Sequence, residues 1–345
     1  MFFQNSAIMN KSDFPKYVTQ FISKYLPFEL GLSTNTIKAY RDTLVLLIKF
    51  FKIIKNLRED RIQIPTISKE IVLEFLDWIQ TNRSCSDSTR NSRLAAIKTF
   101  FRYVKDQDII FLFQFQQIQS IRAKKTMSKT MSYLTIEGLK LLFQQPDLSS
   151  RKGRRDLALL SLMYDSGARV QEIIDLTPSM LRLEKPSTVQ LLGKGNKMRL
   201  VPLLNDQILI LKEYLNEHNL DQAHRNKHPV FYNSKKEKLS RAGINYIISK
   251  YANKAKSKNN SLIPEKLSCH SMRHSKAMHL FQSGVNIVYI KDILGHSSVT
   301  TTERYVRADS KFKREALEKA YLKLTPSETA IWEKNDSLIN WLNKF

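Results

Sequence analysis

A set of basic side chains and one tyrosine between residues 169 and 305 could act together on a phosphate group. His270, Arg273 and His274 follow one another at spacings of three and one, which places them on one face if their segment is helical. Tyr305 lies nine residues after His296. The full set is Arg169, Lys194, His270, Arg273, His296 and Tyr305, with His274 beside the second arginine.

These residue types suit the attack of a hydroxyl group on a phosphodiester. The attack builds negative charge on the non-bridging oxygens, and a guanidinium group meets that charge with a planar fork of donors. Arg169 and Arg273 are the candidates for this contact. A tyrosine phenol, with an ordinary pKa near ~10, attacks more readily beside a base, and its product is a covalent phosphotyrosyl bond. Tyr305 is the candidate nucleophile.

Local signals predict the elements that would carry these side chains. Gly284 interrupts a helical pattern, and a second amphipathic helix follows it and ends at Gly295. Alternating residues on both sides of 193–196 predict a β-hairpin with Lys194 in its turn. Arg169 follows a predicted helix end at 165–167 and begins another helix.

The order of these motifs resembles the tyrosine recombinase family, also called lambda integrase-like or phage integrase. The motifs on which the resemblance rests are H-x-x-R-H at 270–274, L-G-H-S at 294–297 and the tyrosine at 305. Two more lie upstream, G-A-R-V-Q-E at 167–172 and G-K-G-N-K at 193–197. The likeness is strong from 134 to 305 and weaker before it. It implies a mainly α fold with a small antiparallel β-sheet in the catalytic domain, in a two-domain clamp that encircles DNA.

The resemblance also assigns roles to the residues that match its motifs. It implies that His270 is the base, that His296 donates a hydrogen bond to the scissile phosphate, and that Lys194 protonates the departing 5′ oxygen. No cofactor or metal is implied. His274 and Glu172 are expected to be structural partners of the two arginines. Ser166, Ala168, Cys269 and Met272 depart from the commonest spelling of the family at packing or turn positions.

Length and charge favour two DNA-binding domains. The 345 residues exceed what one core usually organises, and 56 Lys and Arg against 32 Asp and Glu give a net charge of +24, which favours a polyanion. Two cysteines are too few for a disulfide framework, so a reducing, cytoplasmic setting is expected. No apolar stretch approaches the length of a membrane span, and no membrane partner is expected.

The predicted domains are an amino-terminal helical core-binding (SAM-like) domain at 1–117, a basic linker at 118–133, the catalytic domain at 134–324, and a helical segment at 325–345. This last segment has an apolar end that must dock on its own domain or on a neighbouring protomer. Basic side chains near the fourth predicted helix and in the linker are candidate contacts to DNA phosphates. They are Arg83, Arg90, Arg93, Lys98, Arg102, Arg122, Lys124 and Lys125.

The resulting hypothesis is a site-specific tyrosine recombinase that acts on double-stranded DNA through a 3′-phosphotyrosyl intermediate. It would work as a homo-tetramer on two DNA sites, alone or with related recombinases, to integrate, excise or transpose a mobile element. An Xer-type chromosome resolution enzyme and a non-cleaving DNA-binding protein remain alternatives. Zinc binding by His270, His274 and His296 is a weaker one, since no acidic or cysteine partner has ligand spacing.

Overall fold

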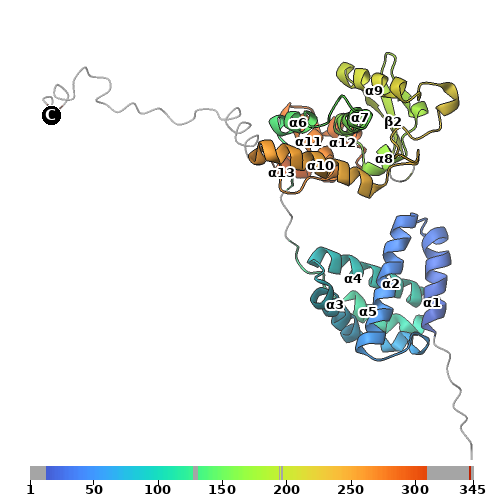
Figure 1. The fold of residues 1–345 in the computed structure, drawn as a ribbon. Helices are drawn as coiled ribbons and strands as arrows, with labels where there is room; N and C mark the ends of the chain where they lie inside the picture. Colours follow the sequence, from blue (N-terminus) through green and yellow to red (C-terminus); the bar gives the residue numbers. More distant parts are fainter. Residues whose placement is uncertain (1–12, 127–130, 194, 196, 309–341, 343–345) are drawn as a thin grey trace, which may run out of the picture. The chain divides into compact units, whose positions relative to one another are not determined.

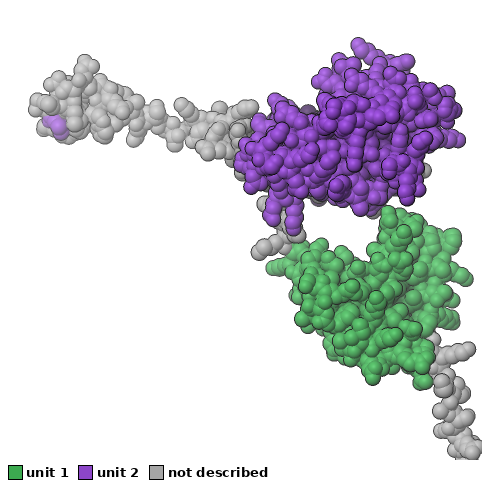
Figure 2. Space-filling view, viewed as in Figure 1, with its two compact units in different colours: residues 1–128 green, residues 129–345 purple. Residues whose placement is uncertain are grey.

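The computed structural model describes residues 13–126, 131–193, 195, 197–308 and 342. The chain divides into two compact units, residues 1–128 and 129–345 (Figure 2), and each unit has a hydrophobic core of its own. Apart from residue 342, the predicted segment 325–345 lies outside the described residues, and so does Lys194. No helix within the described part of the chain is long and apolar enough to cross a membrane.

The regular secondary structure in the described part of the first unit is all helical (Figure 1). Its α-helices are α1 (Phe14–Gln20), α2 (Thr34–Ile54), α3 (Lys69–Arg83), α4 (Asp87–Gln107) and α5 (Leu112–Gln119). A π-helix, η1 (Phe21–Glu29), follows α1, and short 3₁₀ turns occur at η2 (Glu59–Arg61), η3 (Ile64–Thr66) and η4 (Ile109–Phe111).

Serine caps and apolar stripes explain the three long helices of this unit. Ser33, Ser68 and Ser86 each accept a hydrogen bond from a backbone N–H in the first turn of α2, α3 and α4. An apolar stripe at helical spacing on α4 is buried in the core of the first unit. Its members are Leu94, Ile97, Phe101 and Val104.

The end of this unit differs from the prediction of a linker beginning at residue 118. Helix α5 continues to Gln119, and Ile118 and Ile121 are buried in the core of the first unit. The basic composition of the segment gave no sign of this, because two isoleucines three residues apart beside a basic stretch are a short signal. The irregular part of the segment therefore begins after α5.

The second unit combines helices with one small sheet. Its elements are α6 (Ile136–Phe143), α7 (Arg151–Asp165), α8 (Val170–Ile174), η5 (Pro178–Met180), β1 (Leu181–Arg182), β2 (Thr188–Leu192), β3 (Met198–Pro202), α9 (Asn205–Glu217), η6 (Ala223–Arg225), α10 (Arg241–Lys258), η7 (Asn260–Leu262), α11 (Cys269–Gln282), α12 (Ile287–Leu294) and α13 (Thr300–Ala308). The predicted fold class, mainly α with a small antiparallel sheet, is confirmed.

The sheet has the strand order β1-β2-β3, and both pairings are antiparallel. Leu192 pairs with Met198, which closes the predicted hairpin, and the backbone N–H of Gly193 donates to the carbonyl of Lys197 at 2.8 Å. Strand β1 was not predicted, since two residues are too short to show alternation. The sheet fixes where β3 runs past the helices that carry the candidate site.

Candidate active site

The predicted catalytic face of α11 forms as the spacing indicates. Ser268 caps the helix in a reciprocal capping box with Ser271, so the helix begins directly before His270. Arg273 is 4% exposed, whereas His270 on the first turn is exposed. The rings of His270 and His274 are 6.3 Å apart and nearly parallel. One helical face thus presents two imidazoles beside a buried guanidinium.

Arg169 is held at the amino-terminal end of α8 by Glu172. Its backbone N–H donates to Oε2 of Glu172 at 2.7 Å, and its Nη1 donates to Oε1 at 2.9 Å. The preceding Gly167 has a φ of +55°, and a Cβ there would lie 2.7 Å from a methyl carbon of Leu294. Glycine therefore allows the chain to turn tightly into Arg169.

The two predicted arginines meet at the end of α12. Arg273 donates from Nη1 to the carbonyl of Gly167 at 2.7 Å and from Nη2 to the carbonyl of Leu294. Arg169 donates from Nη2 to the carbonyl of Gly295 at 2.8 Å. Successive carbonyls of the same helix end therefore hold the two side chains, although the arginines are far apart in sequence.

Tyr305 and His296 come from the last described turns of the unit. Tyr305 is 1% exposed on α13, and its hydroxyl oxygen lies 3.0 Å from Nδ1 of His274. His296 follows Gly295, the left-handed cap of α12, and its ring stacks on that of Tyr305 with centroids 6.4 Å apart. Thr302, which is fully buried, lies 2.8 Å from Nδ1 of His296 through its hydroxyl.

The structure therefore brings together five of the six residues predicted from the sequence, Arg169, His270, Arg273, His296 and Tyr305. The sixth, Lys194, lies outside the described residues. The sequence indicated only a structural role for His274, yet its Nδ1 lies 3.0 Å from the phenolic oxygen. Arg199 and Thr302 were not predicted, because neither stands in a motif.

The charge at this site is strongly positive. Burial, followed by the neighbouring charges of Arg169 and Arg199, lowers the pKa of Arg273 to about 9. Burial also opposes ionisation of Glu172, but hydrogen bonds and charge from Arg199 and then Arg169 outweigh it, and the pKa of this carboxyl is lowered. Three guanidinium groups around one carboxylate leave an excess of positive charge that a bound anion would relieve.

Not all of the predicted DNA contacts in the first unit are available to a ligand. Arg90 is buried, Arg93 donates to the carbonyl of Ala39 at 3.1 Å, and Nζ of Lys98 donates to the carbonyls of Gln119 and Ile121. Arg93 therefore joins α4 to α2, and Lys98 joins α4 to the end of α5. The other predicted contacts are exposed, and they are Arg83, Arg102, Arg122, Lys124 and Lys125.

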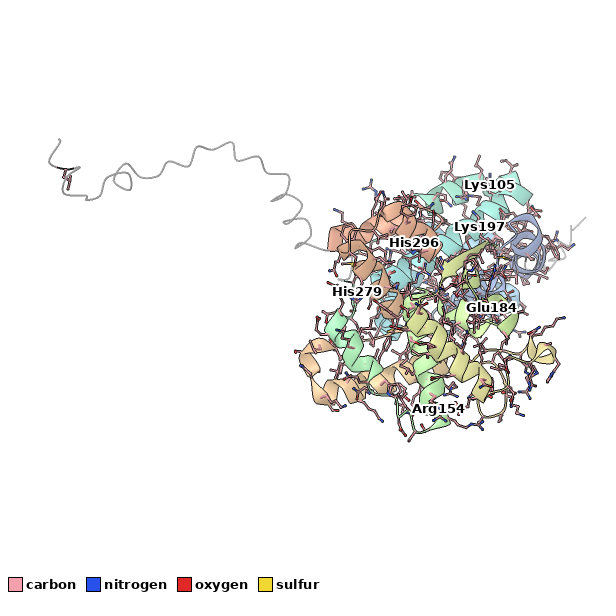
Figure 3. All side chains as sticks on the ribbon, turned by 90° about the horizontal axis from the view of Figure 1, so that it is seen from above. Lys105, Arg154, Glu184, Lys197, His279 and His296 are labelled. Atoms are coloured by element: carbon pink, nitrogen blue, oxygen red, sulfur yellow. The ribbon has the colours of Figure 1, made fainter. Side chains whose placement is uncertain are left out.

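Metal binding finds no support in the described part of the chain, where no three His, Cys, Asp or Glu side chains lie grouped as metal ligands would. The site groups guanidinium side chains with a buried phenol, which suits the binding of an anion (Figure 3 labels His296 and the hairpin residue Lys197).

Comparison with known proteins identifies the family of the chain. Residues 132–311, more than half of the chain, match the model described as "Phage integrase family".

The chain belongs to the phage integrase family. Residues 18–108 match "Phage integrase, N-terminal SAM-like domain". The putative integrase/recombinase y4rC of Sinorhizobium fredii is 31% identical over 316 residues, which cover 90% of this chain and 92% of the relative. Tyrosine recombinase XerD of Pseudomonas putida is 28% identical over 84% of this chain and 91% of the relative.

Solved recombinases share the fold of this phage integrase family member. The Tn1549 transposon integrase in complex with transposon right end DNA has a TM-score of 0.67 at 16% identity, covering 88% of this chain and 97% of that one. The XerH site-specific recombinase bound to a palindromic difH substrate has a TM-score of 0.64 at 24% identity, covering 86% and 80%. Family membership makes this chain a tyrosine recombinase, an enzyme that cleaves and rejoins DNA at specific sites.

Proposed function

We propose that Tyr305 attacks a DNA phosphodiester and forms a 3′-phosphotyrosyl bond. Its phenolic oxygen becomes bonded to phosphorus as the bond to the 5′ oxygen breaks, and the departing oxygen takes up a proton. A 5′ hydroxyl from another strand then reverses the attack, so the bond energy is kept and strands can be exchanged. The observation that supports this proposal most is the placement of two arginines, two histidines and one phenol around the end of α12.

The arginines are proposed to bind the scissile phosphate. Each guanidinium has five N–H donors, and Arg169 and Arg273 each use two of their nitrogens for the contacts described above, so donors remain for phosphate oxygens. Burial and the like charges of Arg169 and Arg199 lower the pKa of Arg273, so its charged form is destabilised. A bound phosphodiester anion would offset this electrostatic repulsion. Charge developing in the transition state would relieve it further.

For the proton of Tyr305 we propose His274 as the acceptor, in place of His270, the base predicted from the sequence. A general base must be within hydrogen-bond reach of the proton that it removes, and Nδ1 of His274 is 3.0 Å from the phenolic oxygen. This role requires Nδ1 without a proton and Nε2 with one. His270 and His296 are then proposed to donate hydrogen bonds to the phosphate, and Lys194 to protonate the 5′ oxygen.

The proposed substrate is double-stranded DNA, on which four protomers would act at two sites in the cytoplasm. Relatives with solved structures are bound to DNA, and the exposed basic residues of the first unit suit phosphate contacts. We favour a mobile-element role, supported by relatives named integrase/recombinase. The Xer-type role has comparable support from relatives named XerC and XerD, and companion recombinase genes between repeats would distinguish the two.

A covalent capture experiment tests the nucleophile. The full chain is incubated with a pool of nicked duplexes carrying randomised inverted arms, and protein-bound DNA that resists boiling in detergent is recovered and sequenced. We expect the wild-type chain to enrich a cognate site and Tyr305→Phe to give no adduct while it still binds the enriched duplex. An adduct formed by Tyr305→Phe would contradict the assignment, and DNA binding without any adduct would favour the non-cleaving alternative.

A further inference from the structure

The carboxyl-terminal end of α12 is held by three arginines rather than two. Its successive carbonyls at Ile293, Leu294 and Gly295 accept from Arg199 at 2.9 Å, from Arg273, and from Arg169 at 2.8 Å. The last carbonyls of an α-helix lack partners within the helix and carry the negative end of its dipole. Each arginine therefore satisfies one of these oxygens, and the helix end fixes the spacing of all three.

Arg199 also binds the carboxylate of Glu172, the group that holds Arg169. Its Nη1 and Nη2 donate to Oε1 and Oε2 of Glu172, each at 2.7 Å, in a bidentate pair whose side chains are only 10% and 2% exposed. Glu172 in turn accepts from the backbone and from the side chain of Arg169. Arg199 thus contacts both of the groups that place Arg169, the carboxylate and the helix end.

Gly295 makes room for this arrangement. Its φ of +63° lies in the left-handed region, and a Cβ at this position would lie 3.0 Å from both Cδ and Nη1 of Arg199. A side chain here would push the guanidinium away from Ile293 and Glu172. His296 follows Gly295 directly in the chain, so the packing of Arg199 against Gly295 also affects the position of His296.

We propose that Arg199 is a positioning residue for strand cleavage: it locks Glu172 and the end of α12 to strand β3, and through them it sets the places of Arg169 and His296. This inference rests on the proposed roles of those two residues. Arg199 stands on β3, the second strand of the hairpin, so it links the hairpin to the arginine centre. Its charge is matched by Glu172, and three of its nitrogens already donate, which fits placement better than phosphate binding.

Arg154 offers a matched control. It forms a bidentate pair with Glu217, from Nε to Oε2 at 2.9 Å and from Nη2 to Oε1 at 2.5 Å, and it stands in the first turns of α7. Figure 3 shows Arg154 well separated from His296. Arg154→Met therefore removes another bidentate arginine–glutamate pair, one that is more exposed, without touching the end of α12.

The test measures single-turnover adduct formation on the captured site at saturating protein, together with the Kd for DNA and the Tm. We expect Arg199→Met to lower the cleavage rate about 10- to 100-fold, as displacement of reacting groups by an ångström does, with Kd within about twofold of wild type. Arg199→Lys keeps the positive charge but lacks the planar fork of donors. Its cleavage rate should lie between those of the wild type and Arg199→Met. Arg154→Met should cleave at the wild-type rate.

A double-mutant cycle separates positioning from direct contact. If Arg199 acts through Arg169, adding Arg199→Met to Arg169→Lys should lower the rate by much less than it does in the wild-type background. Fully multiplicative losses would show an independent contact and overturn the proposal, as would Arg199→Met at the wild-type rate. Should Arg199→Met lose its fold by Tm, the Arg199→Lys series decides by the same criteria. If the wild-type chain forms no Tyr305-dependent adduct, the proposed function itself is refuted.

Discussion

Nδ1 of His274 lies 3.0 Å from the hydroxyl oxygen of Tyr305. The two residues stand on α11 and α13, and this bond joins the helix of the second arginine to the helix of the nucleophile. The ring of His296 also stacks on that of Tyr305, with the two centroids 6.4 Å apart. The phenol is therefore placed by two imidazoles before any DNA is bound.

His274→Gln should lower the rate of adduct formation by about 10²- to 10⁴-fold at neutral pH, the usual contribution of a general base. The loss should shrink as the pH rises from neutral to alkaline, because hydroxide can then take the proton in place of the missing base. Stopped-time adduct assays across this pH range measure it. His270→Gln is the comparison: if that variant, and not His274→Gln, shows recovery at high pH, the base is His270 as the sequence predicted.

Arg169→Lys and Arg273→Lys should each lower cleavage by about 10²- to 10³-fold, the typical effect of removing one donor that stabilises transition-state charge. Lysine keeps the charge at these positions but cannot supply the planar fork or reach the helix carbonyl in the same way. Single-turnover cleavage and gel-shift affinity should be measured together. Cleavage near the wild-type rate in either lysine variant would show that positive charge alone suffices.

Glu172 should make the second unit acid-sensitive. Its pKa is lowered in the folded chain, so it contributes stability above the ordinary carboxyl pKa of about 4.5, and this contribution is lost as the pH falls through the lowered value. Glu172→Gln should cost about 1–3 kcal/mol at pH 7, since two arginines lose a charged acceptor. Urea unfolding at pH 7 and pH 3 should show a smaller difference between wild type and variant at the lower pH.

The exposed basic residues of the first unit should determine the salt dependence of DNA binding. Replacing Arg83, Arg102, Arg122 or Lys125 by methionine should reduce the slope of log K against log salt by about 0.9 for each phosphate that is no longer neutralised. Lys98→Met serves as the comparison, because Nζ of Lys98 donates to two carbonyls at and just after the end of α5. It should lower the Tm of the unit and leave the slope unchanged; a reduced slope would return Lys98 to the set of phosphate-binding residues.

Local signals in the sequence were sufficient for the helices that carry the site. The spacing of His270 and Arg273 placed them on one face, and Gly295 ended α12 in the left-handed conformation that a helix end of this kind requires. The hairpin was recognisable from alternation and a glycine-rich turn. These features depend on residues within one or two turns of each other, which is the range that sequence patterns report.

Contacts between distant segments were not predictable in the same way. Arg199 reads as an ordinary strand arginine, and its partner Ile293 is 94 residues away and contributes only a main-chain oxygen. Lys98 and Arg93 read as a basic helix face, whereas their targets are carbonyls on other segments. Main-chain acceptors have no signature in the sequence, so the residues that bind them could be recognised only from the fold.

The cationic centre of this recombinase is assembled on main-chain oxygens at the end of α12. The side chains of Ile293 and Leu294 make none of these contacts, so they affect charge placement only through the packing of the backbone, in which Leu294 is fully buried. A one-residue insertion between them would shift the anchoring oxygens relative to one another and disperse the three arginines in a single step. Efforts to retarget the enzyme to new DNA sequences should accordingly leave this short stretch of chain at its native length.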